Sequence, residues 1–210
     1  IQILQRQFGV QELVFVGDRG MVKSKGKQAL REAGLHYISA LTDPQIRRLL
    51  GEGTLQMGLF SEEVCEVEAD GLRYLLRRNA VEAAREQHRL EDKLAKLKRK
   101  VEQRNEQVEK SPRCQPEAGP RNLQLWVARH KLTGQVDLRL EGRLVVLERN
   151  QAGIDRAMEL AGCYVVVSDV PQAQLSGQQV HDSYVSLQKV ERDFRQLKTG
   201  LLEVRPVWVR

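Results

Sequence analysis

Two groups of residues in this sequence carry side chains that can bind a metal ion or a phosphate. The first is Asp18, which follows Gly17 at the end of the apolar run Leu13-Val14-Phe15-Val16. Such a run is typical of a strand buried on both faces, and ligands of open α/β sheets bind beyond the carboxyl ends of the strands. A carboxylate placed there can meet a metal ion or a phosphate, and it can equally cap the helix that follows.

The second group lies on a predicted helix near the end of the sequence. Tyr184, Glu191 and Lys198 are spaced seven residues apart, so on a helix they share an arc of about 40°. Glu191 can hold a metal ion, and Lys198 can meet a phosphate. The ordinary alternative is a solvated helix face with a Glu–Lys pair. The arc borders an apolar stripe formed by Leu187, Val190, Phe194, Leu197 and Leu201.

The segment around Asp18 predicts a β-α-β unit. A helical pattern from Lys25 to Ala33 is closed by a glycine, and Leu35–Leu41 is a second apolar strand. Two strands joined by a crossover helix pair in parallel. Thr42-Asp43-Pro44 then begins a short helix that runs through Leu50.

The middle of the sequence carries different structural signals. Asp70-Gly71 between two apolar runs is the strongest short signal for a β hairpin. Residues 79–110 predict a long polar helix with a narrow apolar stripe, and the Pro-rich residues 111–120 predict a linker. The remaining predicted elements are a β segment that includes Leu123–Val127, a hairpin across Glu141-Gly142-Arg143, a strand at Cys163–Val167 and a helix at 178–198.

Composition narrows the classes of function. The 210 residues are 41% hydrophobic, which argues against a wholly disordered chain. No apolar run approaches the roughly 18 residues of a membrane span. A net charge of +6 makes a polyanionic partner plausible, and nucleic acid is the commonest one. Cys65, Cys114 and Cys163 form no C-x-x-C pair, so we expect idle thiols in a reducing compartment and no zinc site.

Both chemistry-bearing groups resemble one family. The segment Val14-Phe15-Val16-Gly17-Asp18-Arg19-Gly20-Met21 is similar to the one that bears the second catalytic aspartate of DDE transposases of the bacterial insertion-sequence type. The terminal helix resembles that family's motif of Tyr, two residues, Arg, three residues, Glu, six residues and Lys. Here Tyr184, Leu187, Glu191 and Lys198 stand at those spacings, and residues 194–198 and 202–207 also look like the family.

The resemblance implies a fold class and a domain division. The fold would be α/β, a ribonuclease-H-like mixed sheet flanked by helices and interrupted by a large α+β insertion. Residues 1–50 would form the first part of the catalytic domain, residues 51–170 the insertion, and residues 171–210 the return to the catalytic core.

The resemblance also implies an activity. DNA would be cleaved at transposon ends and joined to target DNA by two-metal phosphodiester chemistry, with Mg²⁺ or Mn²⁺ held by Asp18 and Glu191. Their carboxylates would then lie within about 4–8 Å of each other. Tyr184, Lys198, Arg195 and Arg19 would contact DNA. Double-stranded DNA would be the partner of a homodimer in a synaptic complex, in the bacterial cytoplasm at the nucleoid.

Three positions depart from the family pattern. Leu187 stands where the family has Arg, and Ala161 stands where the insertion usually has Asp. The first catalytic aspartate is expected upstream of Ile1, so this chain is expected to be a fragment that binds DNA without cutting it. Trp126 is a candidate for stacking on an unpaired base, although a core position in a β hairpin is the more ordinary interpretation.

Three alternatives stay open at this point. One is a catalytically inactive transposase remnant that only binds DNA. Another is an α/β phosphotransfer or phosphatase-like enzyme that uses Asp18. The third is an interaction protein built around the 79–110 helix.

Overall fold

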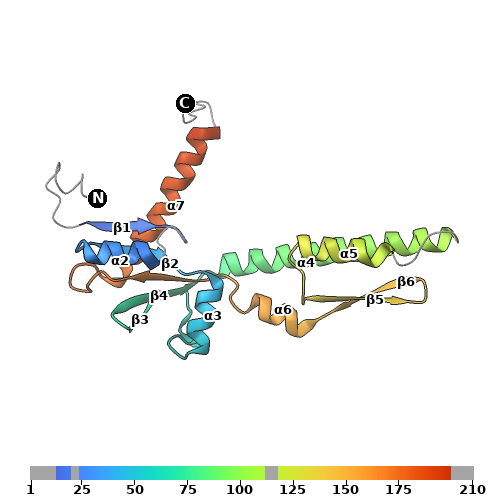
Figure 1. Cartoon of the computed structure of the whole chain (residues 1–210), viewed down its shortest axis with the longest axis horizontal. Helices are drawn as coiled ribbons and strands as arrows, with labels where there is room; N and C mark the ends of the chain where they lie inside the picture. The colour runs from blue at the N-terminus through green and yellow to red at the C-terminus, as the bar shows by residue number, and fades with distance from the viewer. Residues whose placement is uncertain (1–12, 20–23, 112–117, 200–210) are drawn as a thin grey trace. The chain divides into compact units, whose positions relative to one another are not determined.

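The computed structural model describes residues 13–19, 24–111 and 118–199 (Figure 1). The fold is mixed α/β, with a mixed sheet flanked by helices, as the sequence predicts. In the described residues no helix has the length and apolar character needed to cross a membrane. The sheet and its helices comprise β1 (Val14–Gly17), α2 (Ser24–Glu32), β2 (His36–Ala40), α3 (Asp43–Gly51), the 3-10 helix η1 (Met57–Leu59), β3 (Cys65–Ala69), β4 (Leu72–Arg78), β7 (Cys163–Ser168) and α7 (Gly177–Thr199).

Among the described residues five strands form the main sheet, in the order β1-β2-β7-β4-β3. β1 and β2 pair in parallel, with Gly17 opposite Ser39, and α2 connects them. This confirms the predicted β-α-β unit. The other three pairings are antiparallel. Because β1 and β2 run in the same direction, Asp18 and the start of α3 lie at the same edge of the sheet.

The predicted hairpin is the β3–β4 pair. Asp70 and Gly71 both have positive φ angles, 54° and 68°. Positive φ at both central residues is the requirement of a type I′ turn, whose twist matches that of the flanking strands. The pairing runs from Ala69 opposite Leu72 to Cys65 opposite Leu76. β3 is thereby added as the outer strand of the five-stranded sheet.

α7, which corresponds to the predicted helix at 178–198, packs on the sheet. Val180 and Tyr184 of α7 join a buried cluster with Ile38 of β2, Leu75 of β4 and Val166 of β7. α2 covers the opposite face, because Lys27 lies over the ring of Tyr37, 4.8 Å from its centroid, and neighbouring strand residues point to opposite faces. The later turns of α7 continue beyond the sheet (Figure 1).

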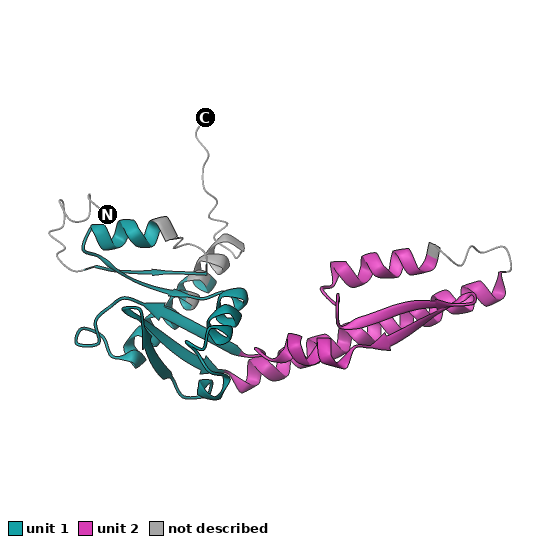
Figure 2. Ribbon diagram, turned by 60° about the horizontal axis from the view of Figure 1, so that its bottom comes forward, with its two compact units in different colours: residues 1–78, 163–210 teal, residues 79–162 magenta. Residues whose placement is uncertain are grey.

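The chain divides into two compact units (Figure 2). We call residues 79–162 the insertion unit and the remainder the sheet unit. The insertion unit covers fewer residues than the 51–170 insertion expected from the sequence. The reason is that β3, β4 and β7 are hydrogen-bonded members of the main sheet. Arg78 and Cys163, which flank the insertion unit, pair directly across β4 and β7.

The insertion unit is built on one long helix, α4 (Ala80–Lys110), in agreement with the predicted 79–110 helix. Its start is capped by Asn79, whose side chain accepts hydrogen bonds from two backbone amides. The predicted hairpin is β5 (Val136–Glu141) with β6 (Leu144–Arg149). α5 (Ala118–Arg129) and α6 (Gln151–Met158) complete the unit. The apolar stripe of α4 is buried against these elements.

Two local predictions for the insertion unit were wrong. The segment Leu123–Val127 belongs to helix α5 and not to a β segment, so Trp126 is a helical residue. Leu123 and Val127, four residues apart, are buried while Leu125 is 64% exposed, which is the pattern of a helix face. The predicted linker 111–120 ends early because α5 begins at Ala118; residues 112–117 are outside the described part of the chain.

Candidate functional site

Asp18 lies at the carboxyl edge of the parallel β1–β2 pair and is half-buried. Its Oδ1 accepts a hydrogen bond from the backbone amide of Arg19 at 2.6 Å. Its carbonyl oxygen lies 3.4 Å from the hydroxyl of Ser39, which is on the neighbouring strand β2. The carboxylate is thus held at the strand end by its own turn and by β2. Within the described residues its second oxygen, Oδ2, accepts no hydrogen bond.

Helix α7 brings Tyr184 to this carboxylate. The Tyr184 hydroxyl donates to Asp18 Oδ1 at 3.3 Å, across 166 positions of sequence. The Tyr184 side chain is buried. Burial, and secondarily the negative charge of Asp18, raises the pKa of Tyr184 above its usual value. The phenol therefore stays protonated at neutral pH and acts as a hydrogen-bond donor.

A basic side chain stands beside this pair. Arg19 is exposed, and its guanidinium lies 3.8 Å from Asp43 Oδ1 at the start of α3. The positive charge of Arg19 also opposes part of the upward shift in the pKa of Tyr184. Arg19 is therefore close to the Asp18–Tyr184 pair and accessible to an anionic ligand.

The other candidate residues share helix α7 with Tyr184. Glu191, Arg195 and Lys198 fall within the helical range Gly177–Thr199, but their side chains lie outside the described residues. Glu191 is two turns beyond Tyr184, about 10.5 Å along a helix axis. The predicted convergence of Asp18 with Glu191 stays a prediction.

Asp18 suits a hard divalent cation as one ligand. A carboxylate oxygen that accepts no hydrogen bond from the described residues, at a half-buried sheet edge, is the type of donor that Mg²⁺ prefers. Among the described residues no cluster of three or more His, Cys, Asp or Glu side chains could hold a metal ion. Asp18 is therefore the one ligand of the predicted pair whose position the structure describes.

A polar cluster next to this site was not predicted from the sequence. His181, one turn before Tyr184, is buried, and its Nε2 lies 2.6 Å from the Tyr164 hydroxyl and 3.3 Å from Arg77 Nη1. Arginine can only donate, so Nε2 is the acceptor and Nδ1 carries the proton. Nδ1 then donates to Asp182 Oδ1 at 3.1 Å. This hydrogen bond lowers the pKa of the Asp182 carboxyl.

The His181 cluster joins three elements of the sheet unit. Arg77 is on β4 and pairs with Tyr164 on β7, while His181 is on α7. The cluster therefore attaches the first turns of α7 to two strands. The spacing of His181 and Tyr184, three residues apart on one helix face, is the sequence signal that could have identified it.

A second anchor holds the segment that leads into α7. The guanidinium of Arg73 on β4 is almost fully buried and binds both carboxylate oxygens of Glu66, at 2.6 and 3.1 Å. Its Nη1 donates to the carbonyl oxygens of Val170 and Leu175, at 2.9 and 2.8 Å. A side chain at Gly177 would collide with Glu66. Arg73 thus fixes where α7 begins.

Trp126, the candidate for base stacking, has one ring face covered. Its ring stacks on the His130 ring with centroids 3.7 Å apart, and His130 Nδ1 lies 2.8 Å from the Trp126 carbonyl oxygen. Trp126 also packs against the core of the insertion unit. The described contacts make it a packing residue of helix α5.

Comparison with protein-family models, curated proteins and solved structures gives no match for this chain.

Proposed function

We propose that this protein is a DDE-type DNA transposase that cleaves DNA at transposon ends and transfers the strands by two-metal phosphodiester chemistry. On this proposal the sheet unit is a ribonuclease-H-like catalytic domain. The observation that carries the proposal is the hydrogen bond from Tyr184 to Asp18. It links the two segments that resemble the family, although the whole insertion unit separates them in the sequence.

Three features of the sheet unit support this function. Asp18 lies at the carboxyl edge of parallel strands, where ligands of open α/β sheets bind. The anchors at Arg73 and His181 fix the start of α7, so they also fix the helix that carries Glu191. The accessible guanidinium of Arg19 supplies a positive charge for a phosphate at the same edge.

Asp18 and Glu191 are the residues that would hold divalent cations. When bound, such ions activate the attacking oxygen and stabilise the leaving oxygen of the phosphodiester. The buried phenol of Tyr184 keeps the carboxylate of Asp18 oriented while remaining protonated. Arg19, Arg195 and Lys198 would bind the DNA phosphates on either side of the cut.

The test is a strand-nicking assay with a supercoiled plasmid that carries the DNA flanking this reading frame on both sides. It is run with Mn²⁺ on the reading frame extended upstream, because the family's first aspartate is expected there. We expect nicking by the extended protein and its loss in Asp18→Asn and Glu191→Gln. Asp137→Asn is the matched control, since this exposed carboxylate on β5 has the same charge and lies in the other unit.

Two outcomes would overturn the proposal. Nicking that survives Asp18→Asn would place the metal ligands elsewhere. Absence of nicking by the extended protein, with DNA binding intact, would favour the inactive remnant that only binds DNA.

A further inference from the structure

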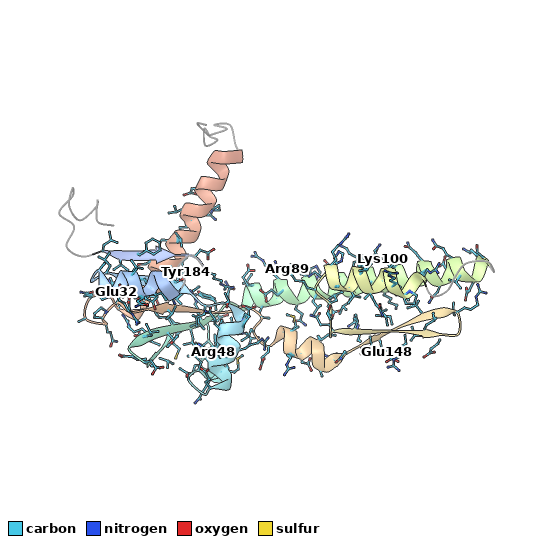
Figure 3. All side chains as sticks on the ribbon, in the orientation of Figure 1. Glu32, Arg48, Arg89, Lys100, Glu148 and Tyr184 are labelled. Atoms are coloured by element: carbon cyan, nitrogen blue, oxygen red, sulfur yellow. The ribbon has the colours of Figure 1, made fainter. Side chains whose placement is uncertain are left out.

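Helix α4 of the insertion unit carries a row of cations along one side. Arg85, Arg89, Lys93, Lys96 and Lys100 follow one another at steps of three and four residues. At 100° per residue these steps place all five within an arc of about 80°. The row spans about 22 Å of helix. Figure 3 labels Arg89 and Lys100 along α4, and Glu148 on the β5–β6 hairpin of the same unit.

The acidic residues of this stretch of α4 pair with residues other than Lys93, Lys96 and Lys100. Glu91 binds Arg149 of β6 at 2.9 Å, and Asp92 lies 3.7 Å from His88. Glu82 pairs with the first two cations of the row, Arg85 and Arg89. None of these three carboxylates therefore forms an ion pair with Lys93, Lys96 or Lys100.

The last three cations of the row form no ion pair with any described residue. Among the described residues no carboxylate lies within 4.0 Å of the amines of Lys93, Lys96 or Lys100. Lys96 and Lys100 are exposed, and half-buried Lys93 donates to the His130 carbonyl oxygen at 3.3 Å. Elsewhere in the unit Lys98, Lys110 and Arg139 each pair with a carboxylate. Three adjacent like charges repel one another, so an anionic ligand would stabilise them.

The kind of anion is constrained by the rest of the helix. A membrane-surface helix needs an exposed apolar face. The apolar stripe of α4, which includes Leu94 and Leu97, is buried against α5 and the β5–β6 hairpin. The large exposed apolar side chain of α4, Val81, lies in the first turn of the helix, before the row begins. The row of cations therefore suits a linear array of charges. Duplex DNA offers one phosphate per 3.4 Å along each strand.

We infer that the Lys93–Lys96–Lys100 row of α4 is a phosphate-binding surface for double-stranded DNA. The choice of DNA over other polyanions rests on the proposed function. The surface itself rests only on the charge arrangement of the insertion unit. It contains none of the residues Asp18, Glu191, Tyr184, Arg195 and Lys198, and it would contact DNA without reading its sequence.

The experiment measures the affinity of the full 210-residue chain for a labelled random-sequence DNA duplex, without divalent cations, as a function of salt. Each phosphate contact contributes about 0.9 to the slope of log K against log salt. Substituting Lys93, Lys96 and Lys100 together with Gln should reduce that slope by about 2.7. When salt is raised from 50 to 200 mM, the affinity of the substituted chain should therefore fall by a factor roughly 40-fold smaller than the affinity of the unsubstituted chain does.

The matched control substitutes Lys98, Lys110 and Arg139 with Gln. It removes the same charge from residues that already have acidic partners, so the slope should change by less than about one contact. Circular dichroism on both variants checks that the helices are retained, which Gln favours. Equal slopes for the two variants would overturn the inference. Tighter binding of duplex RNA than of duplex DNA, lost in the Lys93–Lys96–Lys100 variant, would show that DNA is the wrong partner.

This result is separable from the proposed function. The same loss of slope is expected in an Asp18→Asn background, because binding is measured without metal. If the extended protein does not nick DNA but the Lys93–Lys96–Lys100 substitutions still reduce the slope, the proposed function is contradicted and the α4 surface stands. If the protein nicks DNA but these substitutions leave the slope unchanged, only the α4 surface is contradicted.

Discussion

The hydrogen bond between Tyr184 and Asp18 places a buried neutral donor against a carboxylate whose other oxygen accepts no hydrogen bond within the described residues. A buried phenol without a partner would be destabilising, so the contact stabilises the fold and also orients the carboxylate. The same geometry would suit an Asp18 carboxylate with a structural role or one that binds a metal ion. Stability measurements test the structural role, and metal-binding measurements test the second.

Removing the phenol hydroxyl of Tyr184 tests the contact. We expect Tyr184→Phe to lower the free energy of unfolding by about 1 kcal/mol, the usual net value of an intramolecular hydrogen bond. Tyr74→Phe is the control, since Tyr74 is also buried and its hydroxyl makes no hydrogen bond within the described residues. Urea denaturation measures both. Equal effects of the two substitutions would mean that the Tyr184–Asp18 bond contributes nothing to stability.

At the scale of residues, the sequence predicts Asp18 and Tyr184 as candidate site residues, because a strand end and a seven-residue spacing are recognised from neighbouring positions in the sequence. The sequence does not predict the His181 cluster. Its partners Tyr164 and Arg77 come from strands that are 87 residues apart, and their pairing depends on the register of β4 against β7. A long-range register cannot be derived from local periodicity.

At the scale of elements, the placement of α7 depends on the buried ion pair of Arg73 with Glu66. Arg73 also satisfies two carbonyl oxygens in the segment before the helix. Removing one partner of a buried pair leaves the other charge and those carbonyl groups without compensation.

We expect Arg73→Met to lower the free energy of unfolding by about 3–5 kcal/mol. Hydrogen exchange at the amides of residues 170–176 should accelerate as well, because the two carbonyl contacts hold this segment. The exposed pair of Arg48 with Glu52 provides the control, and Arg48→Met should change stability by about 0.5 kcal/mol or less. Similar losses for the two arginines would contradict the anchoring role of Arg73.

Most elements were predicted, and each failure has an identifiable physical cause. The β-α-β unit, the Asp70-Gly71 hairpin and the long helix carry strong signals of periodicity and turn chemistry. Leu123–Val127 was mistaken for a β segment because a five-residue apolar run does not distinguish a helix from a strand. The unit boundary at Asn79 and Gly162 depends on strand pairings between β4 and β7, which close only after 84 residues of intervening chain.

At the scale of the whole molecule, the two units should be separable. Arg78 and Cys163 face each other as the last residue pair of an antiparallel ladder, so a two-residue turn can join them. We expect the chain with residues 79–162 replaced by Asn-Gly to fold with the same sheet, to retain metal binding and to lose the salt-dependent DNA affinity assigned to α4. Circular dichroism and tyrosine fluorescence report on folding. An unfolded product would show that the sheet unit needs the insertion unit.

The sheet unit also sets the alkaline limit of stability. All four tyrosines, Tyr37, Tyr74, Tyr164 and Tyr184, have raised pKa values with burial as the main cause, and the pKa of Tyr37 is raised to about 12. An acid whose pKa is raised by folding stabilises the native state below its unfolded pKa, near 10. That stability is lost as the pH rises from about 10 through the folded value.

A titration followed at 295 nm should therefore show fewer than half of the tyrosines ionised at pH 10 in the native protein. The same titration in guanidinium chloride should show half-ionisation near pH 10. A native tyrosine that ionises below its unfolded counterpart would contradict the burial of the four rings.

The most direct test of the central claim, that Asp18 and helix α7 form one metal site, is a Mn²⁺ titration of the 210-residue chain followed by electron paramagnetic resonance. We expect bound Mn²⁺ whose affinity falls at least about tenfold in Asp18→Asn and in Glu191→Gln alike, because removal of even an outer-shell partner of a metal site costs about 10–100-fold in affinity. Asp137→Asn should leave it unchanged. Mn²⁺ binding that is equally insensitive to all three substitutions, or lost in Asp18→Asn but not in Glu191→Gln, would contradict the shared site.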